Sequence, residues 1–199
     1  MKEDKKGHSK TAVQWIQALM YLGAIGLIHS AANIVPFMPS EASYYISMGI
    51  QFSLVICLFQ LAPLHKNYRA SAILRAVMFV CSILIAFLKD ASILTFAASI
   101  SSIISVYLEY NAHAHLIKEK DDILARKWKK LFLWGIGAGL LLSFGSMISV
   151  ALLSYFETDV SQIIGIIVGI LGIPEFLVQI VYVVYLNKMI ELIYEREVR

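Results

Sequence analysis

The chain has 199 residues, of which 59% are hydrophobic and 16% are charged, and its mean hydropathy is +0.72. Soluble domains are about 45–50% apolar and about 25% charged, so this composition excludes an ordinary soluble domain. The net charge of +3 does not indicate a nucleic-acid-binding protein, because the cations lie at the ends of long apolar runs.

Six apolar runs follow one another along the chain, and each approaches or exceeds the roughly 20 residues that a helix needs to cross a bilayer. The runs are continuous and do not alternate, so they predict helices. The predicted spans are 12–35, 42–63, 70–88, 91–112, 129–154 and 161–187. The expected fold is all-α: one compact bundle of six transmembrane helices with short loops, a cytoplasmic tail (1–11) and a cytoplasmic helical tail (188–199).

The basic residues predict the orientation of these spans. Sixteen of the seventeen Lys and Arg residues fall in the two tails or in the connections after the second and fourth spans, and the exception is Lys89. This count places Arg75 in the connection after the second span. Cytoplasmic segments carry an excess of such cations. Both termini are therefore expected in the cytoplasm, and the short loops favour a bacterial inner membrane.

The segment 109–132 contains the largest predicted cytoplasmic connection. His113 and His115 would lie about 200° apart around a helix, so no metal site is expected, and Glu109 with His113 is interpreted as a pair on the helix surface. Contact with lipid headgroups or with a protein partner is predicted for the basic residues and the tryptophan of this segment: Arg126, Lys127, Lys129, Lys130 and Trp128.

No enzyme is indicated. Residues 118–143, which include Ala125 and Arg126, partly follow the signature of CDP-alcohol phosphotransferases, but only Asp121 of its four aspartates is present. Those acids hold the divalent ions of that reaction, so this chemistry is not expected. We interpret Asp121 or Asp122 as the cap of the following helix. No cofactor, metal or catalytic residue is predicted.

Polar side chains inside the predicted spans are the main candidates for a ligand site. A carboxylate at mid-depth costs roughly 2.5 kcal/mol or more, so Glu175 should face the protein interior or water. If the first, second and sixth spans are neighbours, one polar cavity is expected. Its predicted lining residues are Glu175, Gln179, Gln51, His29 and Asn33. The alternative is that Glu175 bonds a neighbouring helix and serves only packing.

Two functions follow from these observations. The first is binding or transport of a small solute in the polar cavity; in size and topology the chain resembles in outline the substrate-binding subunits of energy-coupling-factor transporters. The alternative is a non-enzymatic regulator or accessory subunit that binds a membrane protein through the basic connection and the C-terminal tail. Gly135 with Gly139 has the spacing of close helix packing, within the bundle or in a homo-oligomer.

Overall fold

The structure is a computed structural model that describes residues 2–34, 39–88, 91–153 and 161–198. These residues form six α-helices, each with a stretch long and apolar enough to cross a membrane, which confirms the all-helical prediction and suggests an integral membrane protein. The helices are α1 (Lys2–Ile34), α2 (Ser40–Leu61), α3 (Lys66–Phe87), α4 (Ser92–Ile117), α5 (Asp122–Leu153) and α6 (Ser161–Val198).

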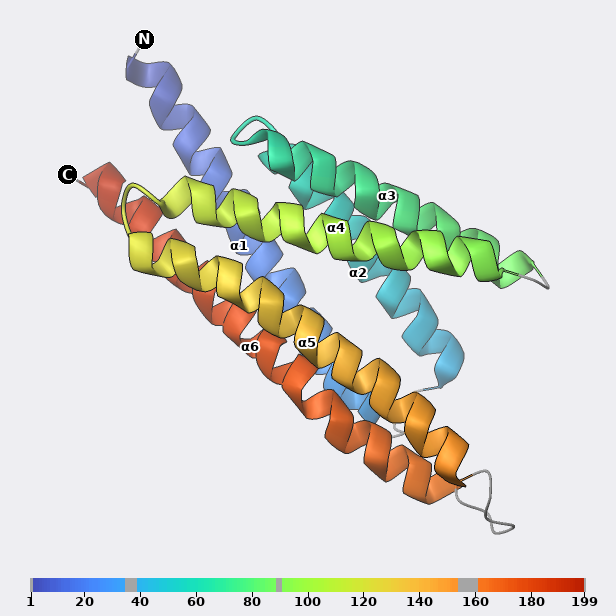
Figure 1. The fold of residues 1–199 in the computed structure, drawn as a ribbon. Coiled ribbons are helices and arrows are strands. Elements are labelled where there is room, and N and C mark those ends of the chain that lie inside the picture. The colour runs from blue at the N-terminus through green and yellow to red at the C-terminus, as the bar shows by residue number, and fades with distance from the viewer. Residues whose placement is uncertain (1, 35–38, 89–90, 154–160, 199) are drawn as a thin grey trace.

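The six helices are arranged as a ring (Figure 1). Each helix packs against its neighbours in sequence, and α6 also packs against α1, which closes the ring. Helix α1 therefore lies between α2 and α6, as the expectation of a shared polar cavity assumed. Both termini lie at one end of the ring, and the α2–α3 and α4–α5 turns lie at the same end (Figure 1).

The core of the protein lies at this same end. Fully buried residues occur in the first halves of α1, α3 and α5 and in the second halves of α2, α4 and α6. Examples from the six helices are Ile16, Leu58, Tyr68, Ile117, Trp128 and Leu186. Toward the other end the helices diverge (Figure 1), and large apolar side chains such as Ile28, Phe87 and Ile93 are 70%, 81% and 84% exposed. We call the packed end the closed end and the opposite end the open end.

Several helices extend further than the apolar runs predicted. Helix α4 continues to Ile117 and α5 begins at Asp122, so only 118–121 remain as the turn between them. Charged residues end an apolar run, but they do not end a helix as long as the backbone stays hydrogen-bonded. The Oδ1 atom of Asp121 accepts a hydrogen bond from the Leu124 N–H at 2.8 Å, which confirms Asp121 as the cap of α5.

The placement of Arg75 in the connection after the second span is wrong. This residue lies inside α3, nine residues after its first residue, which is about 14 Å along the axis at about 1.5 Å per residue. Its side chain is only 14% exposed and pairs with Glu109 of α4. An apolar run can contain an arginine because a buried carboxylate on a neighbouring helix compensates its charge.

Candidate functional site

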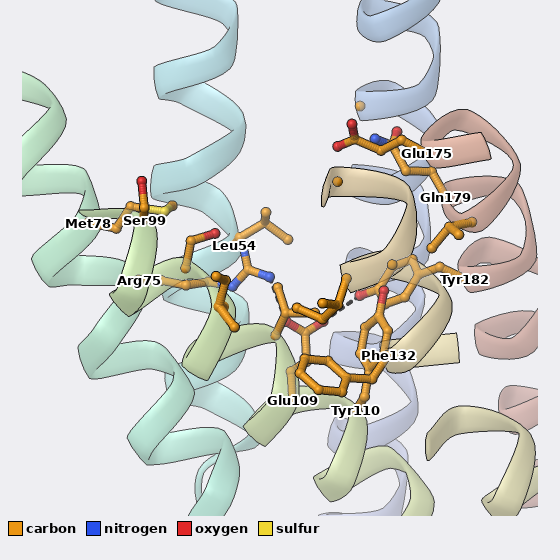
Figure 2. Close-up of a pocket in the computed structure, with 18 of the residues that line it drawn as sticks. Leu54, Arg75, Met78, Ser99, Glu109, Tyr110, Phe132, Glu175, Gln179 and Tyr182 are labelled. Atoms are coloured by element: carbon orange, nitrogen blue, oxygen red, sulfur yellow. Dashed lines mark hydrogen bonds and ion pairs between the residues drawn. The ribbon is translucent and has the colours of Figure 1, made fainter. Parts of the chain in front are cut away.

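A cavity of about 720 Å³ lies within the ring, and all six helices contribute residues to its lining. Figure 2 shows the part of the cavity around Arg75, Tyr182 and Glu175. Its volume falls within the range of about 300–1,000 Å³ that is typical of small-molecule sites. Most of the wall is apolar, and the charged groups come from α3, α4 and α6.

The floor of the cavity is formed by a hydrogen-bonded group that crosses the ring. The Oε2 atom of Glu109 accepts a hydrogen bond from Nη2 of Arg75 at 2.7 Å, and its Oε1 accepts one from the Tyr182 hydroxyl at 2.6 Å. The group therefore joins α3, α4 and α6 (Figure 2). The Glu109 side chain is 1% exposed, so its charge is compensated by protein groups and not by solvent.

Helices α3 and α4 are held together next to this group by two serines. Ser71 and Ser105 lie one turn before Arg75 and Glu109 in their respective helices. Each serine hydroxyl donates to the backbone carbonyl of the other, at 2.9 Å from Ser71 and 3.1 Å from Ser105. Such small residues let two helices approach closely, which brings the Arg75 guanidinium within reach of the carboxylate.

Aromatic rings fill the closed end beneath the floor. Tyr110 stacks on Tyr182 with ring centroids 5.5 Å apart, and Trp128 approaches the same tyrosine at 5.7 Å. The Tyr68 hydroxyl bonds Nδ1 of His113 at 2.7 Å, and the His113 ring lies 4.6 Å from Trp128. This aromatic cluster contains residues of α3, α4, α5 and α6, so it blocks the ring below the cavity.

Two expectations for the segment 109–132 are corrected by this cluster. Glu109 and His113 do not form a surface pair, because their side chains are 1% and 0% exposed; Nε2 of His113 lies 3.6 Å from Oε1 of Glu109. Trp128 is fully buried and cannot contact a headgroup or a partner. It shares one face of α5 with Leu124 and Leu131, and that face packs into the core.

Two of the predicted ligand-site residues line the cavity. Glu175 and Gln179 lie on the same face of α6 as Tyr182, at positions i, i+4 and i+7. The Glu175 carboxylate points into the cavity above the level of Tyr182 (Figure 2). It makes no hydrogen bond or ion pair to any residue that the structure describes.

Of the other three predicted residues, His29 and Gln51 do not line this cavity. The Nε2 atom of His29 lies 3.4 Å from the Ser43 hydroxyl, a contact that joins α1 to α2. Gln51 of α2 is half-buried and is not part of the lining. The side chain of Asn33 lies outside the described residues. The cavity therefore includes the pair on α6 but not His29 or Gln51, and for Asn33 the lining role stays a prediction.

Arg75, Glu109 and Tyr182 were not assigned to the site from the sequence. A signal was present for the first two, because each is an ionisable residue close to or within an apolar run. Both were interpreted as loop or surface residues because they lie near the ends of those runs. Their pairing, across 34 positions of sequence, depends on how α3 packs on α4.

The predicted contact surface on α5 keeps its four cations. Arg126, Lys127, Lys129 and Lys130 are exposed, and Nη2 of Arg126 lies 3.2 Å from Oδ2 of Asp122. Lys120, in the preceding turn, donates a hydrogen bond to the Leu192 carbonyl at 2.9 Å. This bond joins the turn to α6, and we call the turn, the four cations and the contacted part of α6 the surface at the closed end.

No family model matches the chain, and neither a search of curated proteins nor a search of solved structures finds a match. Among the described residues, no group of three or more His, Cys, Asp and Glu side chains is placed to hold a metal ion. The cavity and the surface at the closed end are therefore the two features from which a function can be inferred.

Proposed function

We propose that this protein is a small integral membrane protein that binds or transports a small solute in its central cavity. The observation that carries the proposal is the closed ring of six helices around about 720 Å³ of space, with charged side chains from three helices facing it. Packed bundles leave few voids larger than a water molecule. A cavity of this size with convergent polar groups is the usual form of a small-molecule site.

The shape of the ring supports transport as well as binding. The core is packed at the closed end, and the helices diverge toward the open end (Figure 1). A transporter that exposes its site to one side at a time has this asymmetry. Passage through the closed end would require the bonds of Glu109 to Arg75 and Tyr182 to break, together with separation of the aromatic cluster.

We further propose that the closed end faces the cytoplasm of a bacterial cell, with both termini there. Moving Arg75 into α3 removes one cation from the count but leaves the asymmetry, because the other cations of the turns and tails remain at this end. The cavity would then open toward the outside of the cytoplasmic membrane, which fits uptake or capture of an external solute.

A matched pair of glycine variants tests the solute-binding function. A Cβ atom added at Gly139 or at Gly137 of α5 meets no atom within 4 Å, so both tolerate a larger side chain. Only Gly139 lines the cavity, whereas Gly137 is exposed. Native mass spectrometry of protein extracted gently from its membrane should detect a bound small molecule in the wild type and in Gly137→Leu, and at least tenfold less in Gly139→Leu. Equal occupancy in all three proteins would contradict the proposal.

The surface at the closed end supports a second candidate function, that of a regulator or accessory subunit. Lys120 joins the α4–α5 turn to α6, and the four exposed cations of α5 lie next to it. A membrane protein with an acidic cytoplasmic segment would fit this surface. Replacing Arg126, Lys127, Lys129 and Lys130 with Gln should then release a stoichiometric partner from the purified complex, and an unchanged complex would exclude this role.

A further inference from the structure

The charges that face the cavity do not cancel. Three side chains of its lining are acidic or basic, namely Arg75, Glu109 and Glu175. The first two form an ion pair at 2.7 Å, and the second oxygen of Glu109 is used by the Tyr182 hydroxyl. The pair is neutral as a whole, although Nε of Arg75 has no hydrogen-bond partner among the described residues, so the acidic group that remains for a ligand is the carboxylate of Glu175.

Glu175 of α6 lies at a different level of the ring from the Arg75–Glu109 pair. It precedes Tyr182, the residue that contacts Glu109, by seven residues, which is about 10 Å along the axis at about 1.5 Å per residue. Its carboxylate points into the cavity (Figure 2) and has no partner in the part of the chain that the structure describes. A partly desolvated carboxylate in apolar surroundings strongly favours a cation beside it.

The rest of the wall fits an apolar ligand body better than a polyhydroxylated one. Aliphatic side chains such as Leu54, Val106 and Val178 form much of the lining, and Tyr110, Phe132 and Tyr182 lie at the floor (Figure 2). Aromatic faces also attract cations.

Three of the six hydroxyl groups of the lining donate within the protein, whereas those of Ser102, Ser143 and Tyr110 make no hydrogen bond to the described residues. Ser82 and Ser99 each donate to a carbonyl one turn earlier in their own helix, at 2.9 Å in both cases, and the Tyr182 hydroxyl donates to Glu109. A sugar or another polyol needs many protein donors and acceptors. The lining offers the three remaining hydroxyl groups and the Gln179 amide within a mostly apolar wall, so it suits a polyol less well than an apolar body, and its unpaired carboxylate repels an anion.

From these observations we propose that the cavity binds a monovalent organic cation: an amine with an apolar body, whose ammonium group lies beside Glu175 while its body contacts the aliphatic wall and the aromatic floor. This inference rests on the proposed solute-binding function and specifies the chemical class of the solute.

Three probes of matched shape test the inference with the protein in lipid nanodiscs: 4-phenylbutylamine, 4-phenylbutanol and 4-phenylbutyrate. Binding is measured by isothermal titration calorimetry, with empty nanodiscs as the blank for partition into lipid. The amine should bind the wild type at least tenfold more tightly than the alcohol, and the carboxylate should bind most weakly. In Glu175→Gln the amine and the alcohol should bind equally, with the affinity for the alcohol unchanged.

Glu191→Gln is the matched control, because it removes the same charge from an exposed position of the same helix, where Glu191 accepts a hydrogen bond from Asn187. This variant should keep the preference for the amine. The inference is overturned if the preference persists in Glu175→Gln, if the carboxylate is preferred, or if no probe binds. The comparison of Gly139→Leu with Gly137→Leu tests the solute-binding function separately. The proposed specificity for amines can therefore fail while the solute-binding function holds.

Discussion

At the scale of single residues, Glu109 carries the most consequential interactions of the site. Its carboxylate is 1% exposed and is held by Arg75 and by Tyr182. Removing one partner of a buried ion pair leaves the other charge uncompensated, whereas replacing both by apolar side chains removes the charge altogether.

This difference makes a prediction about stability. Arg75→Met should lower the free energy of unfolding by about 3–5 kcal/mol, and the double variant Arg75→Met with Glu109→Leu should recover much of that loss. Thermal unfolding in nanodiscs, followed by tryptophan fluorescence, provides the measurement. The exposed pair Asp122 with Arg126 is the control, because exposed pairs contribute about 0–1 kcal/mol. A double variant less stable than Arg75→Met would show that the two charges do not compensate one another.

His65 gives a prediction about pH. It precedes α3, and its Nδ1 accepts a hydrogen bond from the Asn67 N–H at 3.2 Å. The pKa of His65 lies below its ordinary value of 6.5, because burial disfavours the imidazolium and the nearby His115 and Lys66 add to this effect. Protonation would also remove the acceptor that caps the helix.

The direction of the pH effect on stability depends on whether the folded or the unfolded state binds the proton more tightly. The unfolded chain takes up a proton near pH 6.5 and the folded protein only at lower pH, so this contribution to stability is present above 6.5 and is lost as the pH falls below it. His65→Asn keeps a capping side chain without the titration. Its melting temperature should therefore fall less than that of the wild type between pH 7.5 and pH 5, and parallel curves would refute the assignment.

The sequence predicted part of the site at this scale. Glu175 was found because it stands alone inside an apolar run, where a charge needs an explanation. Arg75 and Glu109 were missed because each lies near the point where a run ends, and a hydropathy pattern does not distinguish a residue that ends a span from one that pairs within it. That distinction depends on a tertiary contact between α3 and α4.

At the scale of the helices, the described glycines that are packed most tightly against another helix are ones that the small-residue spacing did not single out. A Cβ atom at Gly145 would lie 2.7 Å from Cδ1 of Leu171, and one at Gly23 would lie 3.1 Å from Cγ2 of Val183. By contrast, Gly135 and Gly139 line the cavity. The spacing identifies helix faces made of small residues, but it does not tell which of these faces pack against another helix and which face the cavity.

This difference predicts how alanine substitutions at two glycines of α1 change stability. At Gly26 an added Cβ meets no atom within 4 Å, so Gly26→Ala should stabilise the protein by roughly 0.5–1 kcal/mol through the lower entropy of the unfolded chain. At Gly23 the same methyl group also lies 3.2 Å from Cε1 of Tyr182, which bonds Glu109. Gly23→Ala should therefore gain less or lose stability, as measured by thermal unfolding, and equal effects would contradict the packing of α1 on α6.

At the scale of the whole molecule, the number and type of helices could be predicted because each apolar run has the length of a membrane span. The closure of the ring by α6 on α1 could not, since hydropathy carries no information on which helices are neighbours. The position of the core at one end of the ring could not be predicted either, because it depends on the side chains of all six helices meeting there.

The proposed orientation is tested by fusions at both ends of the ring. Alkaline phosphatase, which folds only outside the cytoplasm, should be inactive when fused after Tyr194 at the closed end and active when inserted after Leu88 at the open end. Green fluorescent protein should give the opposite pattern. Active phosphatase at Tyr194 would reverse the orientation and place the opening of the cavity on the cytoplasmic side.

The central claim is that the ring encloses a binding site for a small solute, and its most direct test is an electron cryomicroscopy map of the protein extracted into nanodiscs from its own membrane. We expect density that belongs to neither protein nor lipid between Glu175 and the floor at Tyr182, with the Arg75–Glu109 pair intact below it. A map in which α1 and α4 pack together without a cavity, or in which lipid chains alone fill the space, would contradict the proposed solute site.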